Sequence, residues 1–157
     1  MNKNIASDYN CTIPIEIEDG IFLCRSEVIQ NKDILQKYGI TAIVNCMKTN
    51  TNRYEDFVYK DLNLKGTNDE DISMYFKPMY KWIEDNKDRK IILHCDKAVS
   101  CSVSIIISYL MLKHKWTFEI AMKKIKIKRE MASPIINYLG QLIELEFEIF
   151  DTFRLNI

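Results

Sequence analysis

The chain has 157 residues, of which 47% are hydrophobic, so we expect one domain with a substantial buried core. Its 22 basic and 22 acidic side chains balance, which argues against nucleic acid or an anionic membrane surface as a partner. The sequence contains no run of 18 apolar residues and therefore predicts no membrane-spanning helix.

The cysteines are odd in number and scattered, which does not indicate a disulfide framework. Residues 1–10 are polar and lack the apolar segment of a secretory signal. We therefore expect reduced thiols in a cytoplasmic protein, with the nucleus as a second compartment. No two cysteines have the Cys-x₂-Cys spacing of a zinc site, so we expect no metal and no other cofactor. The cysteines are Cys11, Cys24, Cys46, Cys95 and Cys101.

The first part of the chain predicts a hairpin, a short helix and a buried strand. Apolar residues alternate on either side of Asp19-Gly20, a pair typical of a hairpin turn. Asn31 can cap a helix over residues 32–38, which Gly39 would close. The β-branched and apolar run at residues 41–46 indicates a strand buried in a sheet.

The middle of the chain predicts another strand and then a helix. Residues 57–62 have the composition of a strand and lie between a polar loop at 47–55 and a Gly-, Asn- and Asp-rich loop at 63–71. Apolar residues then recur at helical spacing over residues 72–86. They are Ile72, Tyr75, Phe76, Met79, Tyr80 and Ile83.

Residues 91–112 have the order strand, short loop, helix. Residues 91–93 are large and apolar, and Ser100 or Ser102 can cap the apolar helix that follows. Loop amides and the positive end of a helix dipole both attract negative charge. We therefore expect an anion-binding loop here, with Cys95 as a nucleophile at its head.

The remaining sequence predicts two further helices. Thr117 can cap a helix with one apolar side and one basic side, and Ser133-Pro134 is typical of the start of a last helix. We interpret the basic side as a solvated face, with docking of an acidic partner as the alternative. The whole alternation predicts an α/β fold, a mostly parallel sheet of about five strands flanked by helices. The basic side chains are Lys123, Lys124, Lys126, Lys128 and Arg129.

The loop at Cys95 resembles the signature loop of the cysteine-dependent protein tyrosine phosphatases, and in particular that of the small dual-specificity phosphatases. That signature is His-Cys, five residues, an arginine, and then serine or threonine. The resemblance implies a single dual-specificity-phosphatase-like domain over residues 1–157, with its core at about 14–150. The matching positions are His94, Cys95, Val99, Ser100 and Ser102 in the loop, the segments 35–45, 71–76 and 109–111, and Ala121, Arg129, Pro134, Gln141 and Leu142.

Three positions depart from the family pattern. Cys101 replaces the family arginine, Ala98 replaces a loop glycine, and Gly66 falls where the family has its general-acid aspartate. Loss of the arginine fork should slow phosphoryl transfer at least about 10²–10³-fold, and loss of the acid about 10²–10⁴-fold. Alanine in a left-handed loop position costs about 1 kcal/mol, which favours another loop shape.

The resemblance also implies roles for the residues around the loop. Cys95 has the position of the ancestral nucleophile, and Ser102 that of the hydroxyl that supports the leaving thiolate. His94 is expected to orient the loop through hydrogen bonds. Lys97 is the one candidate for a substitute cation, although side chains in such a loop generally point outward. The expected phosphate-binding loop is Asp96, Lys97, Ala98, Val99, Ser100 and Cys101, and the candidate substitute acids are Asp61, Asp69 and Asp71.

Three hypotheses for the function result. The one that the departures favour is a pseudophosphatase that binds phosphoproteins, kinases or other signalling partners. The second is an active protein tyrosine and serine/threonine phosphatase, in which Cys95 forms a phosphocysteine intermediate without a metal. The third is a redox-responsive module in which Cys95 and Cys101 form a disulfide, with two reduced thiols as the simpler reading.

Overall fold

The computed structural model describes residues 11–48 and 53–155. Residues 1–10, in which the sequence lacks a secretory signal, lie outside the described residues, as do residues 49–52 of the predicted polar loop. Within the described ranges, no helix is both long enough and apolar enough to cross a membrane.

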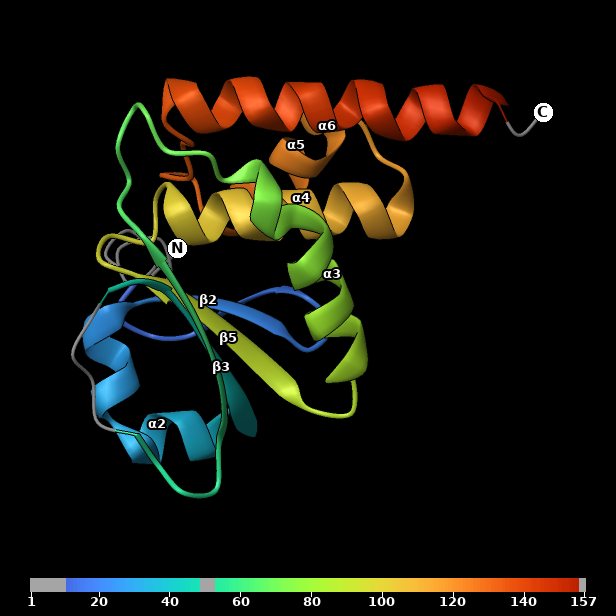
Figure 1. The fold of residues 1–157 in the computed structure, drawn as a ribbon. Helices are drawn as coiled ribbons and strands as arrows, with labels where there is room; N and C mark the ends of the chain where they lie inside the picture. Colours follow the sequence, from blue (N-terminus) through green and yellow to red (C-terminus); the bar gives the residue numbers. More distant parts are fainter. Residues whose placement is uncertain (1–10, 49–52, 156–157) are drawn as a thin grey trace, which may run out of the picture.

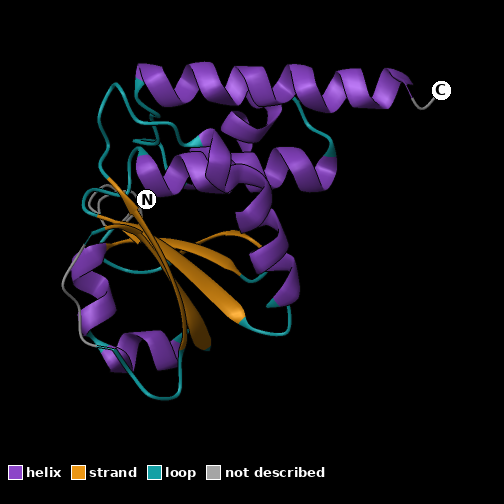
Figure 2. Ribbon diagram, viewed as in Figure 1, coloured by secondary structure: helices purple, strands orange, loops and turns teal. Residues whose placement is uncertain are grey.

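A five-stranded sheet forms the centre of the fold, as predicted (Figure 1, Figure 2). The strand order is β1-β2-β5-β3-β4, and every neighbouring pair is parallel except β1 and β2. The antiparallel pair is the predicted hairpin, with Gly20 at a φ of +79° in its turn. The strands are β1 (Ile15–Glu18), β2 (Ile21–Arg25), β3 (Ile40–Met47), β4 (Val58–Leu64) and β5 (Lys90–Cys95).

Helices cover both faces of the sheet (Figure 2). Between the sheet and the helices lie two separate apolar cores. The smaller core lies under η1 (Ser26–Gln30) and α2 (Lys32–Lys37), and the Asn31 side chain caps α2 as predicted. The larger core lies on the other face. It is covered by η2 (Ser73–Tyr75), α3 (Phe76–Asp85), α4 (Cys101–His114), α5 (Phe118–Lys128) and α6 (Ile136–Leu155).

Helix α4 is the central helix, because it packs between the sheet and α6 (Figure 1). Its residues from Cys101 to Met111 are all buried, which explains why apolar residues occupy its whole circumference. Strand β5 is buried from Ile91 to Cys95 and feeds directly into the loop before α4. The carboxyl end of β5 and the first turn of α4 therefore meet inside the molecule.

Two predicted helix boundaries were wrong. The helix expected over residues 72–86 begins as the short 3₁₀ segment η2 and becomes α-helical only at Phe76. The last helix begins at Ile136, whereas the sequence suggested a start at Pro134 with Ser133 as its cap. The reason is tertiary: the Ser133 amide donates to the Val99 carbonyl at 2.8 Å, and the Ile135 amide donates to the Ser100 hydroxyl at 3.0 Å. These bonds hold the segment before α6 against the Cys95 loop.

Candidate functional site

Cys95 is the last residue of β5, where the carboxyl ends of the parallel strands meet. Its side chain is buried, and its Sγ lies 2.9 Å from the hydroxyl oxygen of Ser102 in the first turn of α4. A hydroxyl at this distance can donate to a thiolate. The structure thus brings together the two residues for which the sequence implied a shared role.

The loop between Cys95 and α4 keeps a left-handed residue although it has lost the family glycine. Ala98 is fully buried and has a φ of +55°. The alternative loop shape that the substitution favoured is therefore not adopted at this residue. A strain of about 1 kcal/mol remains in the loop and has to be offset by its surroundings.

Arg129 supplies part of that support. Its Nε donates to the Ala98 carbonyl and its Nη2 to the Lys97 carbonyl, both at 3.2 Å. The side chain is buried, so its assignment to the solvated basic side of the helix was wrong. The sequence carried a signal: Arg129 follows Ala121 and Ile125 at spacings of four, and both of those residues are buried.

Cys101 lies at the start of α4 and is buried against α6. Its Sγ is 3.7 Å from the hydroxyl of Tyr138, which in turn donates to the Glu70 carboxylate. Burial raises the pKa of the Cys101 thiol to about 11, so this side chain is neutral at ordinary pH. The position that the resemblance gives to a fixed positive charge thus holds an uncharged group.

Gly66 lies next to Cys101 in the folded chain. A Cβ placed on Gly66 would be 3.5 Å from the Cys101 sulfur, and the residue has a φ of +72°. The Glu70 carboxylate accepts hydrogen bonds from the backbone amides of Lys65 and Gly66, at 2.7 and 3.2 Å. The segment that would carry a general acid therefore does approach the Cys95 loop, but it brings no acidic side chain at this residue.

The three aspartates considered as substitute acids are engaged elsewhere. Asp61 forms an ion pair with Arg53, and Asp71 accepts from the Ser73 amide at 3.0 Å. Asp69 is exposed, and a hydrogen bond from the Thr67 side chain lowers the pKa of its carboxyl. None of the three is among the described residues that line the pocket at Cys95.

A pocket of about 370 Å³ opens over the Cys95 loop. Two cationic residues line it, Lys65 from the end of β4 and Lys97 from the loop, and Asp96 is the carboxylate among its described lining residues. Such a pocket can hold an anion against loop amides and a helix N-terminus. Its lining is completed by Met47, Gly66, Cys95, Val99, Ser100, Cys101, Ser133 and Ile135.

The hydrogen bond of His94 runs to η1 and not to the Cys95 loop. Its Nδ1 lies 2.9 Å from the hydroxyl of Ser26 in η1, and its Nε2 is buried without a hydrogen-bond partner in the described chain. Burial lowers the pKa of His94 to about 4, against a smaller opposing effect of Asp61. The imidazole is therefore neutral at pH 7.

All five cysteines are buried, and none of them forms a disulfide bond. Burial is the largest cause of the raised thiol pKa of Cys24 and of Cys46. Within the described ranges, no group of three or more His, Cys, Asp or Glu side chains is arranged to hold a metal ion.

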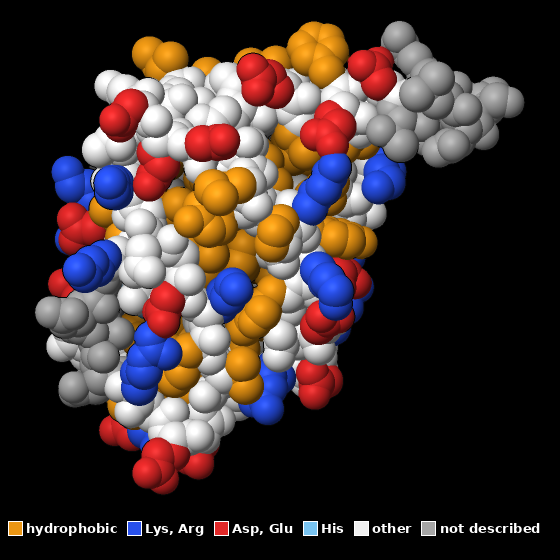
Figure 3. All heavy atoms as spheres, viewed as in Figure 1, with side chains coloured by type: hydrophobic (Ala, Val, Ile, Leu, Met, Phe, Trp, Pro, Cys, Tyr) orange, Lys and Arg blue, Asp and Glu red, His pale blue; other side chains and the backbone are white. Residues whose placement is uncertain are grey.

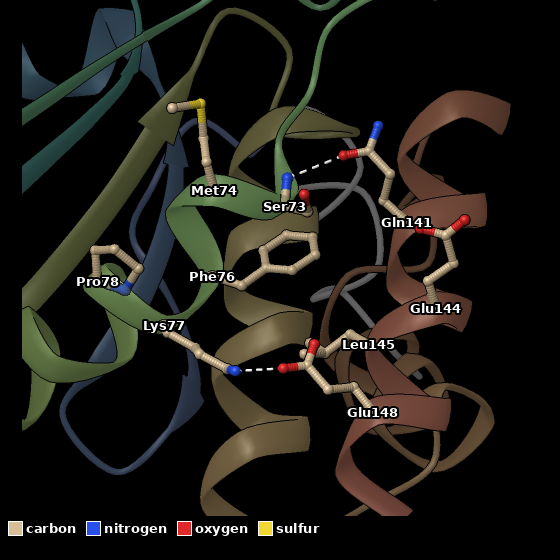
Figure 4. Close-up of a pocket in the computed structure, with 9 residues that line it drawn as sticks. All are labelled: Ser73, Met74, Phe76, Lys77, Pro78, Gln141, Glu144, Leu145 and Glu148. Atoms are coloured by element: carbon tan, nitrogen blue, oxygen red, sulfur yellow. Dashed lines mark hydrogen bonds and ion pairs between the residues drawn. The ribbon is translucent and has the colours of Figure 1, made fainter. Parts of the chain in front are cut away.

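A second pocket, of about 360 Å³, lies between the start of α3 and α6 (Figure 4). Here Gln141 Oε1 accepts from the amides of Ile72 and Ser73, at 2.7 and 2.9 Å, and Lys77 pairs with Glu148. Gln141 Nε2 also donates to the Glu70 carbonyl. These contacts fasten the segment that follows Gly66 to α6.

Comparison with known sequences agrees with the resemblance. Residues 21–148 match the family model described as the catalytic domain of dual specificity phosphatases. The chain is 33% identical over 137 residues to dual specificity protein phosphatase 1 of Arabidopsis thaliana, covering 85% of this chain and 69% of that protein. It is 30% identical over 142 residues to dual specificity protein phosphatase 4 of rat. This match covers 88% of the chain but only 36% of the longer rat protein.

Two solved structures have the same fold. A variant of human DUSP28 superposes with a TM-score of 0.84 at 17% identity, covering 89% of this chain and 98% of that one. The human tyrosine phosphatase-like serine/threonine/tyrosine-interacting protein gives a TM-score of 0.82 at 23% identity, covering 88% and 99%. At these identities the likeness concerns the arrangement of the backbone.

Proposed function

The chain belongs to the dual specificity phosphatase family, and from this premise we propose that it is a catalytically impaired member that binds phosphorylated proteins. We propose that residues 1–157 act as one domain with its core at about 14–150. The bound group would be a phosphorylated tyrosine, serine or threonine of a signalling protein or kinase. It would lie in the pocket over the Cys95 loop.

The neutral thiol at Cys101 is the observation that carries this proposal. A phosphoryl transition state places negative charge on equatorial oxygens, and an arginine fork would hold two of them at once. A buried thiol with a pKa of about 11 holds neither. Loss of a charge-assisted contact of this kind lowers a rate by about 10²–10³ or more.

The features that remain are those that binding needs. The residues of the Cys95 loop, the start of α4 and the cationic residues Lys65 and Lys97 line one pocket. The segment after Gly66 is fastened to α6 through Gln141 and Asn137, whose side chains donate to the Glu70 carbonyl at 2.9 and 2.7 Å. A pocket with fixed walls loses little conformational entropy when it binds a ligand.

The second candidate is an active phosphatase with an unusual site. It is favoured by the 2.9 Å contact between Cys95 and Ser102 and by the left-handed Ala98, since both preserve the local geometry of a nucleophile loop. In this case Cys95 would form a phosphocysteine intermediate without a metal. The phosphoryl group would then pass to water, with Ser102 stabilising the departing thiolate.

The initial rate of hydrolysis of an aryl phosphate, measured in reductant, separates the two candidates. For a binding protein we expect the wild type, Cys95→Ser and buffer alone to give the same rate. Cys46→Ser is a matched control, because Cys46 is buried outside the described lining of the pocket. A wild-type rate that disappears in Cys95→Ser and persists in Cys46→Ser would contradict the proposal.

The binding part of the proposal has its own readout. A fluorescent phosphotyrosine peptide should bind the wild type and Cys95→Ser more tightly than the same peptide without phosphate. Inorganic phosphate should compete for the site. Equal affinity for both peptides would show that the pocket does not recognise a phosphoryl group.

A further inference from the structure

The outer face of α6 exposes a row of apolar side chains. Ile136, Ile143 and Phe147 are 85%, 39% and 64% exposed. With Gly140, where an added Cβ would meet nothing within 4 Å, they follow the 4-3-4 spacing by which one helix packs against another. An apolar row of this kind on a 20-residue helix is a candidate interaction surface.

Acidic residues flank this row. Figure 3 shows acidic and hydrophobic side chains side by side along the edge of the molecule that α6 forms. Glu144 and Asp151 are exposed beside the row, and Glu148, which pairs with Lys77, lies one turn from Glu144 (Figure 4). These acidic side chains favour a partner surface that is apolar at its centre and basic at its edges.

Helix α5 carries a surface of that kind in the same molecule. Ile120 and Ile127 are 48% and 79% exposed and lie two turns apart on one side of the helix. Lys123, which pairs with Glu119, and Lys126 are exposed around them. The exposed side of α5 is thus apolar and basic, and that of α6 is apolar and acidic.

We propose that α5 of one copy of this chain docks on the outer face of α6 of a second copy. Pairing α6 with α6 would bring acidic flanks together, and pairing α5 with α5 would bring lysines together, whereas the crossed pairing is complementary. The formal net charge of the chain is +0, so whole copies do not repel one another. The proposal does not depend on whether Cys95 is catalytic.

A contact between α5 of one copy and α6 of another determines how many copies can associate. A contact between two different surfaces leaves one α5 and one α6 face unused at the ends of a pair, so further copies can add unless a ring closes. A single helix face is smaller than the roughly 800 Å² per partner of a standard stable interface. We therefore expect association in the micromolar range, weakened by salt.

Sedimentation velocity of the full chain in reductant tests the proposal. Between about 5 and 500 µM the mean mass of the wild type should rise with concentration and fall when salt is raised. Ile127→Glu places a carboxylate against acidic α6, and Phe147→Glu removes an exposed aromatic side chain from the apolar row of α6. Each variant alone should remain monomeric.

Mixing the two variants is the sharpest readout. Ile127→Glu keeps an intact α6 face and Phe147→Glu keeps an intact α5 face, so an equimolar mixture should form a dimer and stop there. Ile13→Glu, which alters an exposed apolar residue outside both helices, should associate like the wild type. Circular dichroism melting checks that each variant is folded.

Three results would overturn the proposal. One is a wild type that remains monomeric over the whole range, which would leave these faces to a different partner. Another is self-association of either folded variant to the wild-type extent. The third is a mixture that stays monomeric while the wild type associates, because this would show that the contact does not join α5 to α6.

Discussion

At the scale of single residues, Cys101 places an uncharged group in the pocket over the Cys95 loop. Its buried, neutral thiol lies against Tyr138, and beyond Tyr138 lies the Glu70 carboxylate. A guanidinium at position 101 would therefore find a negative charge nearby to orient it. The same guanidinium could hold two oxygens of a phosphoryl group in the pocket that Cys101 lines.

We predict that Cys101→Arg raises the rate of aryl phosphate hydrolysis at least about 10²-fold above the wild type, because it restores a charge-assisted contact with the transition state. Cys101→Lys should gain less, since an ammonium group has no planar fork. Adding Cys95→Ser should abolish the gain. An equal rate in the wild type and in folded Cys101→Arg would show that Cys101 is not what limits catalysis.

Single residues were also where inference from the sequence was least complete. Cys95, Ser102 and the departures at the loop could be recognised from a linear motif, because the motif is contiguous. Arg129 lies about 30 residues away and reaches the loop only through the fold. The partner of His94 is Ser26, 68 residues earlier, which no local pattern indicates.

At the scale of elements, two serine or threonine residues precede helices and have different roles. The Thr117 hydroxyl accepts from the Ile120 amide at 3.3 Å and so caps α5, as the sequence predicted. Ser100 occupies the corresponding position before α4, but its side chain makes no capping bond there. Its hydroxyl accepts instead from the Ile135 amide, ahead of α6.

We predict that the two alanine variants loosen different elements. Thr117→Ala should lose about 1 kcal/mol and lower Tm by about 2–4 °C, with faster hydrogen exchange in the first turn of α5. Ser100→Ala leaves the Ile135 amide without its acceptor and should lose about 1–3 kcal/mol, with faster exchange before α6. Thr117→Ser is the control that keeps a cap. Faster exchange confined to the first turn of α4 in Ser100→Ala would contradict this assignment.

Most of the helices and strands could be predicted, because an element that is buried on one side or on all sides has a recognisable spacing of apolar residues. The hairpin around Gly20 and the cap at Asn31 depend on contacts within a few residues, and both were predicted correctly. The start of α6 depends on bonds to Val99 and Ser100, more than 30 residues earlier. The predicted start of α6 was therefore wrong, because it depends on contacts that only the folded chain makes.

At the scale of the whole molecule, alternating strands and helices were sufficient to predict a parallel sheet covered on both faces. The alternation of strands and helices does not indicate which helix faces remain exposed to solvent. Helices α5 and α6 both cover the larger core, yet each keeps an exposed apolar and charged side. The balanced total charge of the sequence conceals this separation, because the basic and acidic surfaces cancel in the sum.

The burial of His94 makes the stability of the whole fold depend on pH. Its pKa is about 4 in the folded chain, below the ordinary value of 6.5, because burial disfavours the imidazolium. Between these values the unfolded chain binds a proton that the folded chain does not. Stability is therefore fully present above about pH 6.5 and falls as the pH approaches 4, by up to about 3 kcal/mol from this group.

We predict that His94→Asn removes this part of the pH dependence. Asparagine can keep a hydrogen bond to Ser26 and does not titrate. Urea unfolding of both proteins from pH 7 to pH 4 gives two free-energy profiles, and their difference isolates His94 from the carboxylates that titrate in both. The wild type should lose about 3 kcal/mol more than His94→Asn over this range. Parallel profiles would mean that His94 is protonated in the folded chain, and that the side of the sheet covered by η1 tolerates a charge at the carboxyl end of β5.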